Sequence, residues 1–183
     1  MSIINLGTYP PKKCGIAAFS KDLRDNLELL GQNVHIGAIS DNEYSYSYPP
    51  EVIFELRQHE LTDYEMTARL LNLSSDVELC IIQHEYGIFG GPDGEYILSF
   101  TGKLKKPFIL IAHTVLPAPS DNQQRILSLL TRQAAGVVCM SRRSARLLTS
   151  VFSVPASKIY VIHHGVPVFP PQDREVLKAC YGM

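Results

Sequence analysis

The feature that most constrains this chain is the alternation of short apolar runs with segments of helical spacing. Near-continuous apolar runs, which predict buried strands, occupy residues 77–83, 107–112 and 136–140. Amphipathic segments that predict helices lie between them. Because parallel strands are joined by right-handed crossovers, such a sequence predicts helices on both faces of the sheet. We therefore expect a single α/β domain built on a doubly wound parallel sheet.

The other predicted elements complete this alternation along the chain. Further strands are expected at 2–6, 33–40, 52–56 and 158–162, and helices at 16–30, 61–73, 93–103, 121–133, 142–152 and 173–180. Thr62 and Glu65 fit a capping box at the start of the second helix. The sequence also predicts N-caps at Ser120 or Asp121 and at Ser141, and a C-terminal cap at Gly31.

The loop after the first strand ends at a glycine that opens a helix. Gly15 would let a ligand approach the backbone closely, and the N–H groups and dipole of the helix favour an anion. Lys12 and Lys13 add positive charge nearby. The alternative is that Gly15 only serves a tight turn beside two solvated lysines. The loop matches neither the G-x-G-x-x-G fingerprint of dinucleotide-binding proteins nor the phosphate loop of nucleoside triphosphatases, which ends in G-K-[ST]. It therefore predicts neither a nicotinamide site nor an ATP site.

Three loops that follow predicted strands carry unusual side chains, namely 8–15, 84–92 and 113–120. Ligands of doubly wound sheets bind at the carboxyl ends of the strands. If the first and fourth strands are neighbours, the first two loops face each other. We therefore expect Gly15, His113 and the 84–91 loop to surround one open cleft.

Two side chains in these loops suit hydrogen bonding or proton transfer. His113 follows a buried strand and can donate or accept a hydrogen bond at neutral pH, although it could equally bond to a local carbonyl as a structural residue. Glu85 could be a general base, could form a salt bridge with Lys12 or Lys13, or could have no such partner. The His163–His164 pair has no partner at ligand spacing, so no metal site is expected.

The composition narrows the function classes. The 183 residues include 17 basic and 18 acidic side chains, which gives no support for a nucleic-acid partner. The four cysteines contain no C-x-x-C pair, so a zinc or redox motif is not expected, and they suggest a reducing, cytoplasmic compartment. We find no apolar run long enough to span a membrane and no signal-peptide pattern.

Four segments resemble motifs of one enzyme family. The sequences TYPPKKCGIA (8–17), IQHEYGIFGG (82–91), LIAHT (110–114) and IHHGV (162–166) resemble segments of retaining GT-B glycosyltransferases, often called family four. They occur in the order typical of that family and cover residues 2–167. Many members have glycine where this chain has Cys14, and aspartate where it has Pro167.

The resemblance implies an enzyme of two Rossmann-like domains that transfers a sugar from a nucleotide-sugar to an acceptor, with retention and without a metal or other cofactor. The N-terminal domain would hold the acceptor and the C-terminal domain the nucleotide. It implies that His113 is catalytic, beside the transferred sugar. The helix N-terminus would approach a donor or acceptor phosphate through Lys13, Cys14 and Gly15. The residues implied on the acceptor side are His84, Glu85, Tyr86 and Gly87.

The resemblance also predicts the domain organisation. We expect residues 1–168 to form the acceptor-side domain, and 169–183 to be a linker and helical tail leading to a missing C-terminal domain. The expected partners are the nucleotide-sugar, a small-molecule acceptor and that domain, without which the chain should be inactive. The sequence leaves two further possibilities, namely peripheral membrane association of the full-length enzyme and a dimer formed through the exposed cleft.

Two other readings of the sequence remain. The chain could be a stand-alone, non-catalytic α/β ligand-binding domain, for which a complete sheet and near-neutral charge suffice. It could also belong to a GT-B relative that does not transfer sugars to acceptors, such as a sugar-nucleotide epimerase or a phosphorylase.

Overall fold

A parallel sheet of seven strands forms the centre of the structure, a computed structural model that describes residues 1–41, 45–166 and 174–181. The strands are β1 (Ser2–Gly7), β2 (Val34–Ser40), β3 (Val52–Arg57), β4 (Val77–His84), β5 (Phe108–Ala112), β6 (Gly136–Cys139) and β7 (Ile159–Val161). Their order is β3-β2-β1-β4-β5-β6-β7, and every neighbouring pair is parallel. The doubly wound parallel sheet expected from the sequence is therefore confirmed.

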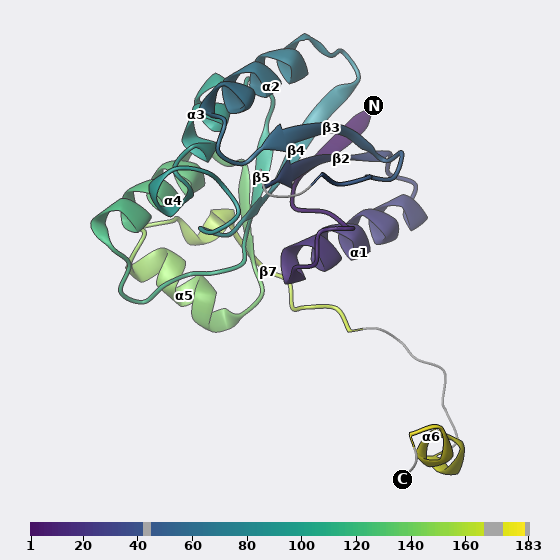
Figure 1. Ribbon diagram of the computed structural model, residues 1–183. Helices are drawn as coiled ribbons and strands as arrows, with labels where there is room; N and C mark the ends of the chain where they lie inside the picture. The colour runs from purple at the N-terminus through teal and green to yellow at the C-terminus, as the bar shows by residue number, and fades with distance from the viewer. Residues whose placement is uncertain (42–44, 167–173, 182–183) are drawn as a thin grey trace.

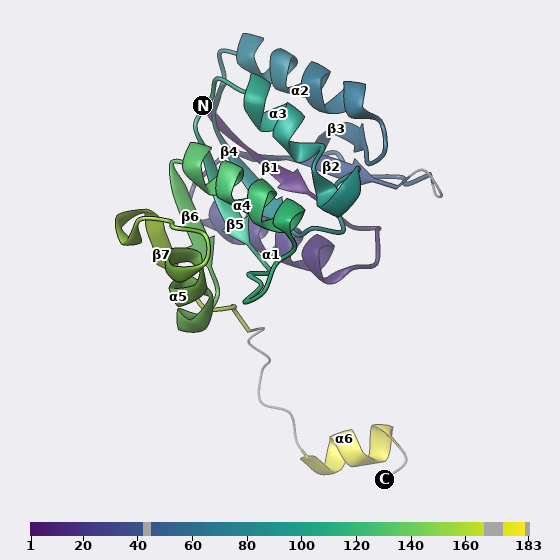
Figure 2. The ribbon, with the colours of Figure 1, turned by 90° about the vertical axis from the view of Figure 1, so that its left-hand side faces the viewer.

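The helices cover both faces of this sheet. They are α1 (Gly15–Leu29), α2 (Leu61–Leu73), α3 (Ile97–Lys103), α4 (Asp121–Gln133) and α5 (Arg142–Ser150), with short 3-10 turns η1 (Pro92–Gly94) and η2 (Ala156–Lys158). The chain also contains α6 (Arg174–Cys180), which does not cover the sheet in Figure 1. Figures 1 and 2 show α1 on one face, and α2, α3 and α4 on the other. The chain moves from β1 toward one edge of the sheet and from β4 toward the other, so right-handed crossovers place their helices on opposite faces.

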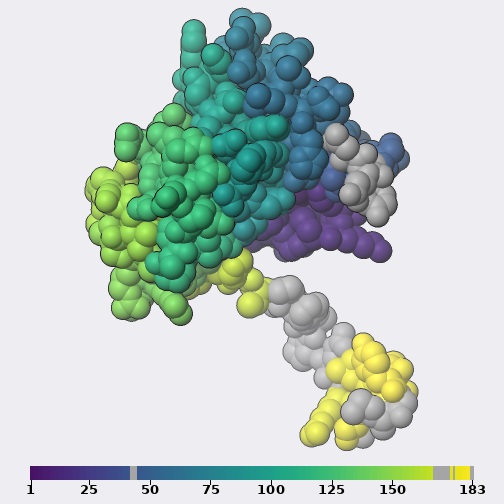
Figure 3. Space-filling view, turned by 60° about the vertical axis from the view of Figure 1, so that its left-hand side comes forward, coloured from purple at the N-terminus to yellow at the C-terminus, as the bar shows by residue number. Residues whose placement is uncertain are grey.

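The two faces of the central strands differ in polarity. Ile4, Leu6 and Ile82 are fully buried in the main apolar core, together with side chains of α2, α3 and α4. The surfaces of these helices form one continuous layer (Figure 3). Successive side chains of a strand point to opposite faces. Asn5 and Gln83 therefore point toward α1, and both are buried although they are polar.

Two predicted local features differ from the structure. α2 begins at Leu61 after an N-cap at Glu60 that makes no side-chain cap bond, so the expected capping box of Thr62 and Glu65 is wrong. Thr62 lies inside the first helical turn, where the extended backbone of an N-cap is not available. Asp63 instead accepts hydrogen bonds from the backbone N–H and the guanidinium of Arg57.

The helix expected at 93–103 is interrupted at its start. Asp93 has a φ of 53° within η1, and α3 begins only at Ile97. The Asp93 carboxylate accepts hydrogen bonds from Asn122 (2.9 Å) and Gln123 (3.1 Å) of α4. These contacts with α4 hold Asp93 outside the helical conformation.

The other predicted caps are present. Ser120 forms a capping box with Gln123, Ser141 accepts a hydrogen bond from Ser144 N, and Gly31 follows α1 with a φ of 79°. The helical tail is described as α6, whereas the expected domain boundary between 168 and 169 lies outside the described residues. None of the described helices has the length and hydrophobicity that crossing a membrane requires.

The core predicts a sharp difference between two identical substitutions. Leu110 is 0% exposed in β5, whereas Leu70 is 63% exposed on α2. Leu110→Ala should lower the free energy of unfolding by about 2–5 kcal/mol, through lost apolar burial and the cavity left behind. Leu70→Ala should change it by less than about 0.5 kcal/mol. Urea denaturation of both variants tests this, and equal losses would contradict the assigned core.

Candidate functional site

Three loops meet at the carboxyl edge of the sheet because β1, β4 and β5 are consecutive neighbours. The backbone N–H of His113, directly after β5, donates to the carbonyl of His84 at the end of β4 (3.0 Å). The β1–α1 loop lies on the other side of β4. The carboxyl ends of these strands, where α/β sheets bind ligands, thus bring 8–14, 85–92 and 113–120 together.

The N-terminus of α1 is capped by a thiol. Cys14 is the N-cap residue, and its Sγ accepts a hydrogen bond from Ala17 N (3.3 Å) and lies 3.0 Å from Thr8 Oγ1. Ala18 N donates to the Cys14 carbonyl. Within the described part of the chain, the N–H groups of Gly15 and Ile16 have no partner. Sequence reasoning placed Cys14 at a phosphate and missed this capping role.

The approach to this helix end is open at Gly15. The residue is exposed, and a Cβ atom built there would meet no atom within 4 Å. Lys13 beside it is exposed as well. Two unpaired N–H groups, the positive end of the helix dipole and an exposed lysine together favour an anion.

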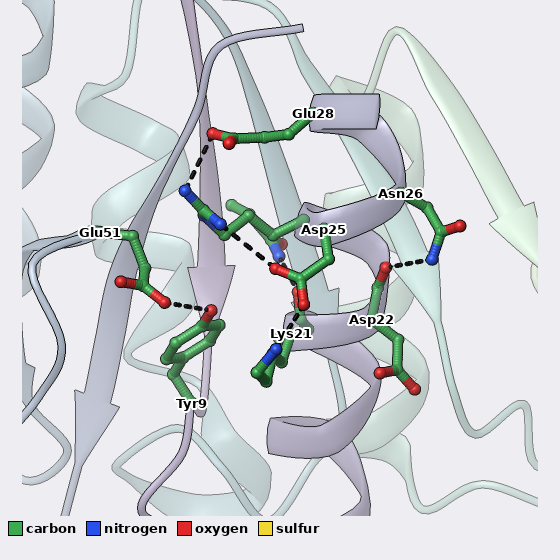
Figure 4. Close-up of polar contacts among 10 residues, drawn as sticks. Tyr9, Lys21, Asp22, Asp25, Asn26, Glu28 and Glu51 are labelled. Atoms are coloured by element: carbon green, nitrogen blue, oxygen red, sulfur yellow. Dashed lines mark hydrogen bonds and ion pairs between the residues drawn. The ribbon is translucent and has the colours of Figure 1, made fainter. Parts of the chain in front are cut away.

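The loop before α1 is fixed to the β2–β3 side of the domain. Lys12 forms an ion pair with Asp41 (2.8 Å), and the buried Tyr9 donates its hydroxyl to Glu51 (3.0 Å; Figure 4). Burial, and then the neighbouring Glu51, raise the pKa of Tyr9. Lys12 is therefore engaged with Asp41 rather than with Glu85.

His113 lies against the first turns of α1. Its ring meets Phe19 edge-on with centroids 4.8 Å apart, and Phe19 lies one helical turn after Gly15. His113 Nε2 is 2.8 Å from Gln83 Oε1, so its side-chain partner is an amide and not a local carbonyl. Burial, and then the nearby His164, lower the pKa of His113 to about 4, so its ring is neutral at physiological pH.

The four residues expected on the acceptor side occupy different environments. The structure does not bring His84 to the surface: it is 1% exposed and packs edge-on against Tyr86, with centroids 4.9 Å apart. Tyr86 is buried beside it, whereas Gly87 is exposed and Glu85 is half-buried. Glu85 accepts hydrogen bonds from Thr114 Oγ1 (2.5 Å) and Tyr86 N (3.0 Å), so it pairs with neither lysine considered above.

His84 points away from α1 because it follows Gln83 in the same strand. Burial, and then His113, lower its pKa to about 4. Neither ring nitrogen has a hydrogen-bond partner among the residues that the structure describes. The two histidines of the predicted site therefore lie on opposite faces of the sheet, and only His113 faces α1.

Sequence reasoning missed two buried amides in the site. Asn5 interrupts the apolar run of β1 and Gln83 ends that of β4, and they are 1% and 0% exposed. Gln83 Nε2 donates to Asn5 Oδ1 (2.8 Å). An amide inside a central strand is a usable signal, because a buried polar group is costly unless it is hydrogen-bonded.

Metal-ligating residues do not cluster in the described ranges. No group of three or more His, Cys, Asp or Glu side chains within 1–41, 45–166 and 174–181 could hold a metal ion. The His163 ring nitrogen Nδ1 is 3.2 Å from the Met140 carbonyl. The four cysteines are free thiols, and burial raises the pKa of Cys80 to about 12.

The doubly wound parallel sheet, with helices on both faces, defines an α/β domain of the Rossmann-like class. The sequence profile of Glycosyltransferase Family 4 matches residues 14–168, and this chain belongs to that family. No curated protein sequence matches the chain significantly.

Solved glycosyltransferases share the fold. A glycosyltransferase from Rickettsia africae ESF-5 is similar to 99% of this chain, at 16% identity and a TM-score of 0.63. An alpha-glucosyltransferase in complex with UDP and a 13-mer DNA is similar to 99% of it, at 15% identity and a TM-score of 0.58. An alpha-glucosyltransferase in complex with UDP-glucose and DNA containing an abasic site is similar to 88% of this chain, at 16% identity and a TM-score of 0.58.

This chain spans less than half of each of these structures, namely 49%, 44% and 42% of their lengths. The fold expected from the GT-B resemblance is confirmed. Two of these structures contain DNA, so the expectation of no nucleic-acid partner is not borne out by these neighbours.

The Cys14 cap predicts a difference between two small substitutions. Cys14→Ala removes the acceptor for Ala17 N and should lower the free energy of unfolding by about 0.5–2 kcal/mol, whereas Cys14→Ser keeps a capping oxygen. Chemical denaturation measures both variants. An alanine variant as stable as the serine variant would show that the thiol does not cap α1.

The buried histidine predicts acid sensitivity. The pKa of His84 falls from 6.5 to about 4 on folding, so the unfolded chain binds a proton more readily between these values. The contribution of the neutral His84 to the free energy of unfolding should be complete above about pH 6.5. It should decline as the pH falls toward 4, by about 1–2 kcal/mol at pH 5. His113 adds to the decline in the same direction.

Unfolding free energies measured from about pH 7 to pH 5 test this prediction. His84→Phe should reduce the dependence of the unfolding free energy on pH, while His59→Phe, which changes an exposed histidine, should leave that dependence unchanged. A slope that is equally steep in all three proteins would contradict the assignment to His84.

Proposed function

We propose that this chain is the acceptor-side domain of a retaining glycosyltransferase, which transfers a sugar from a nucleotide-sugar to an acceptor. The observation that carries the proposal is the meeting of two different groups in one site. The unpaired N–H groups of Gly15 and Ile16 favour an anion, and the neutral His113 packs against Phe19, which lies one helical turn after Gly15. A phosphate and a sugar hydroxyl are adjacent in a nucleotide-sugar. Membership of Glycosyltransferase Family 4 supports this reading.

The donor side of the site is proposed at the start of α1. Lys13, Cys14 and Gly15 would face the diphosphate, with the backbone N–H groups as donors and the Lys13 ammonium as a nearby positive charge. Preorganised donors of this kind stabilise negative charge as it develops on a leaving group. The Cys14 side chain would contribute by capping the helix.

The acceptor side is proposed at 84–87. Glu85 and Gly87 are its accessible residues, and the buried rings of His84 and Tyr86 would support the loop from below. Glu85 is held by the Thr114 hydroxyl, which orients its carboxylate beside the end of β5. A carboxylate in that position can accept hydrogen bonds from acceptor hydroxyl groups.

The remaining parts of the proposal concern the whole protein. A second domain, reached through residues 169–183, would bind the nucleotide and close over the site, and this chain alone would not turn over. No metal or other cofactor is required by the proposed chemistry, because backbone N–H groups and basic side chains would neutralise the leaving diphosphate. UDP and UDP-glucose in the neighbouring structures make a UDP-sugar the first donor to test.

The direct test is an assay of the natural full-length protein that contains this chain. With a panel of nucleotide-sugars, it should release the nucleoside diphosphate and transfer the sugar with retained anomeric configuration, and the 1–183 fragment should do neither. Epimerisation of the donor without transfer would support the epimerase alternative. Binding without any turnover in the full-length protein would support a non-catalytic domain.

The proposed role of His113 predicts a specific kinetic defect. His113→Ala in the full-length enzyme should lower the rate of transfer by about 10²–10³-fold, which is typical for loss of one preorganised polar contact. His59→Ala, which changes an exposed histidine, should leave the rate unchanged. Steady-state kinetics and thermal melts on the same preparations measure both effects. If turnover per folded molecule survives while stability falls by about 1–3 kcal/mol, His113 is structural.

A further inference from the structure

Two buried amides connect α1 with His113 through a continuous series of hydrogen bonds. Asn5 Nδ2 donates to the backbone carbonyl of Ser20 in α1 (3.3 Å). Gln83 Nε2 donates to Asn5 Oδ1 (2.8 Å), and Gln83 Oε1 is 2.8 Å from His113 Nε2. We call Asn5 and Gln83 the amide ladder. It crosses from β1 to β4 and ends at the imidazole that follows β5.

The direction of every bond in the ladder follows from its first member. The Ser20 carbonyl can only accept, so the NH₂ group of Asn5 must face it and the Asn5 oxygen must face Gln83. The NH₂ group of Gln83 then faces Asn5, and its oxygen faces His113. An oxygen in that position can only accept, so the proton of the neutral imidazole must be on Nε2.

We propose that Asn5 and Gln83 are positioning residues that hold His113 in the Nε2–H tautomer, so that its unprotonated Nδ1 accepts a hydrogen bond from a sugar hydroxyl. The identity of the hydroxyl as part of a sugar rests on the proposed function, whereas the tautomer follows from the ladder. The hydrogen bond of the His113 ring runs through Nε2, and no described residue bonds to its Nδ1. An open lone pair recognises an O–H or N–H donor and not a phosphate oxygen, which only accepts.

The site thereby separates two chemical classes of ligand group. The N–H groups of Gly15 and Ile16 can only donate and therefore suit an oxyanion. His113 Nδ1 can only accept in this tautomer and therefore suits a hydroxyl. The opposite tautomer would present a second donor and would favour an anionic oxygen at both positions. The ladder thus directs the phosphate of a glycosyl phosphate to the N–H groups of α1 and a sugar hydroxyl to His113.

The backbone makes room for the ladder. A Cβ atom at Gly7 would lie 2.8 Å from both Cβ and Cγ of Gln83, closer than real Cβ contacts allow. The glycine that ends β1 therefore lets Gln83 extend beneath α1. Burying two amides is costly compared with apolar side chains of the same size unless both are hydrogen-bonded, and here both are.

Besides burial, His164 from the segment after β7 lowers the pKa of His113, and His113 in turn lowers the pKa of His84 in β4. α1 presents the uncharged Phe19, and Glu85 is bonded to Thr114. Burial and His164 keep the ring neutral, which the tautomer argument requires.

Nitrogen-15 NMR of the histidine side chains in the 183-residue chain tests the proposal without any substrate. The signals of His113 are assigned by their loss in His113→Gln. They should report one tautomer, with a protonated Nε2 and an unprotonated Nδ1. An Nδ1–H tautomer in the folded protein would overturn the proposal.

Two substitutions of Gln83 test whether the ladder is the cause. Gln83→Met keeps the length of the side chain but removes the acceptor, and should give a mixture of tautomers. Gln83→Glu keeps an acceptor and adds a negative charge, so the Nε2–H tautomer should persist and the titration midpoint of His113 should rise by at least about one pH unit. Folding is verified from amide spectra. If Gln83→Met fails to fold, Gln83→Glu decides, and an unchanged midpoint would overturn the proposal.

Ser20→Ala is the matched control. The Ser20 hydroxyl is buried and has no partner among the described residues, while its backbone carbonyl accepts the first bond of the ladder. This change should therefore leave the tautomer unchanged, and a mixed tautomer in Ser20→Ala would contradict the assigned ladder.

Failure of this inference can be separated from failure of the proposed function. Transfer by the full-length enzyme together with an Nδ1–H tautomer would contradict the ladder alone. The expected tautomers without any sugar transfer would support the ladder and reject a sugar as the source of the hydroxyl.

Discussion

The parallel pairing of β1 with β4 is the contact on which the rest of the structure depends. The chain first winds from β1 to β2 and β3, and then returns to place β4 on the other side of β1. This reversal puts α1 on one face and α2, α3 and α4 on the other (Figure 2). It also makes the loop after β1 and the loop after β4 neighbours at the carboxyl edge. An anion-favouring helix end and a histidine held by amides can therefore share one site.

The strands and helices could be predicted because their hydrophobic periods are local properties of the sequence. Errors arise where a distant residue decides the conformation, or where an uncommon residue type takes a local role. Asp93 leaves the helical region because Asn122 and Gln123 of α4 hold its carboxylate. Cys14 caps α1 with a thiol, a role that residue preferences for N-caps do not suggest. The contact of Asp93 with α4 cannot be read from a local window of the sequence, whereas the contact of Cys14 with Ala17 is local and is missed because a thiol is not among the preferred N-cap groups.

The site was predictable at the level of strand ends but not of side-chain direction. The sequence indicates His113 because it follows a buried strand, and Gly15 because it opens a helix after the first loop, and the structure brings them together through Phe19. His84 was selected for the same reason, but alternation along β4 turns it into the core and turns Gln83 toward α1. The expected ligand contact, His84, and the residue that orients His113, Gln83, are therefore adjacent in the sequence but lie on opposite faces of the sheet. The face of β4 that α1 covers depends on the strand order.

The central claim is that one site on this domain binds the phosphate and the sugar of the same donor through different groups. A crystal structure of the full-length protein with an intact nucleotide-sugar tests it most directly. A diphosphate oxygen should lie within about 2.7–3.2 Å of the N–H of Gly15 or Ile16, and a sugar hydroxyl at the same distance from His113 Nδ1. A donor bound with its sugar and diphosphate away from both groups would contradict the account.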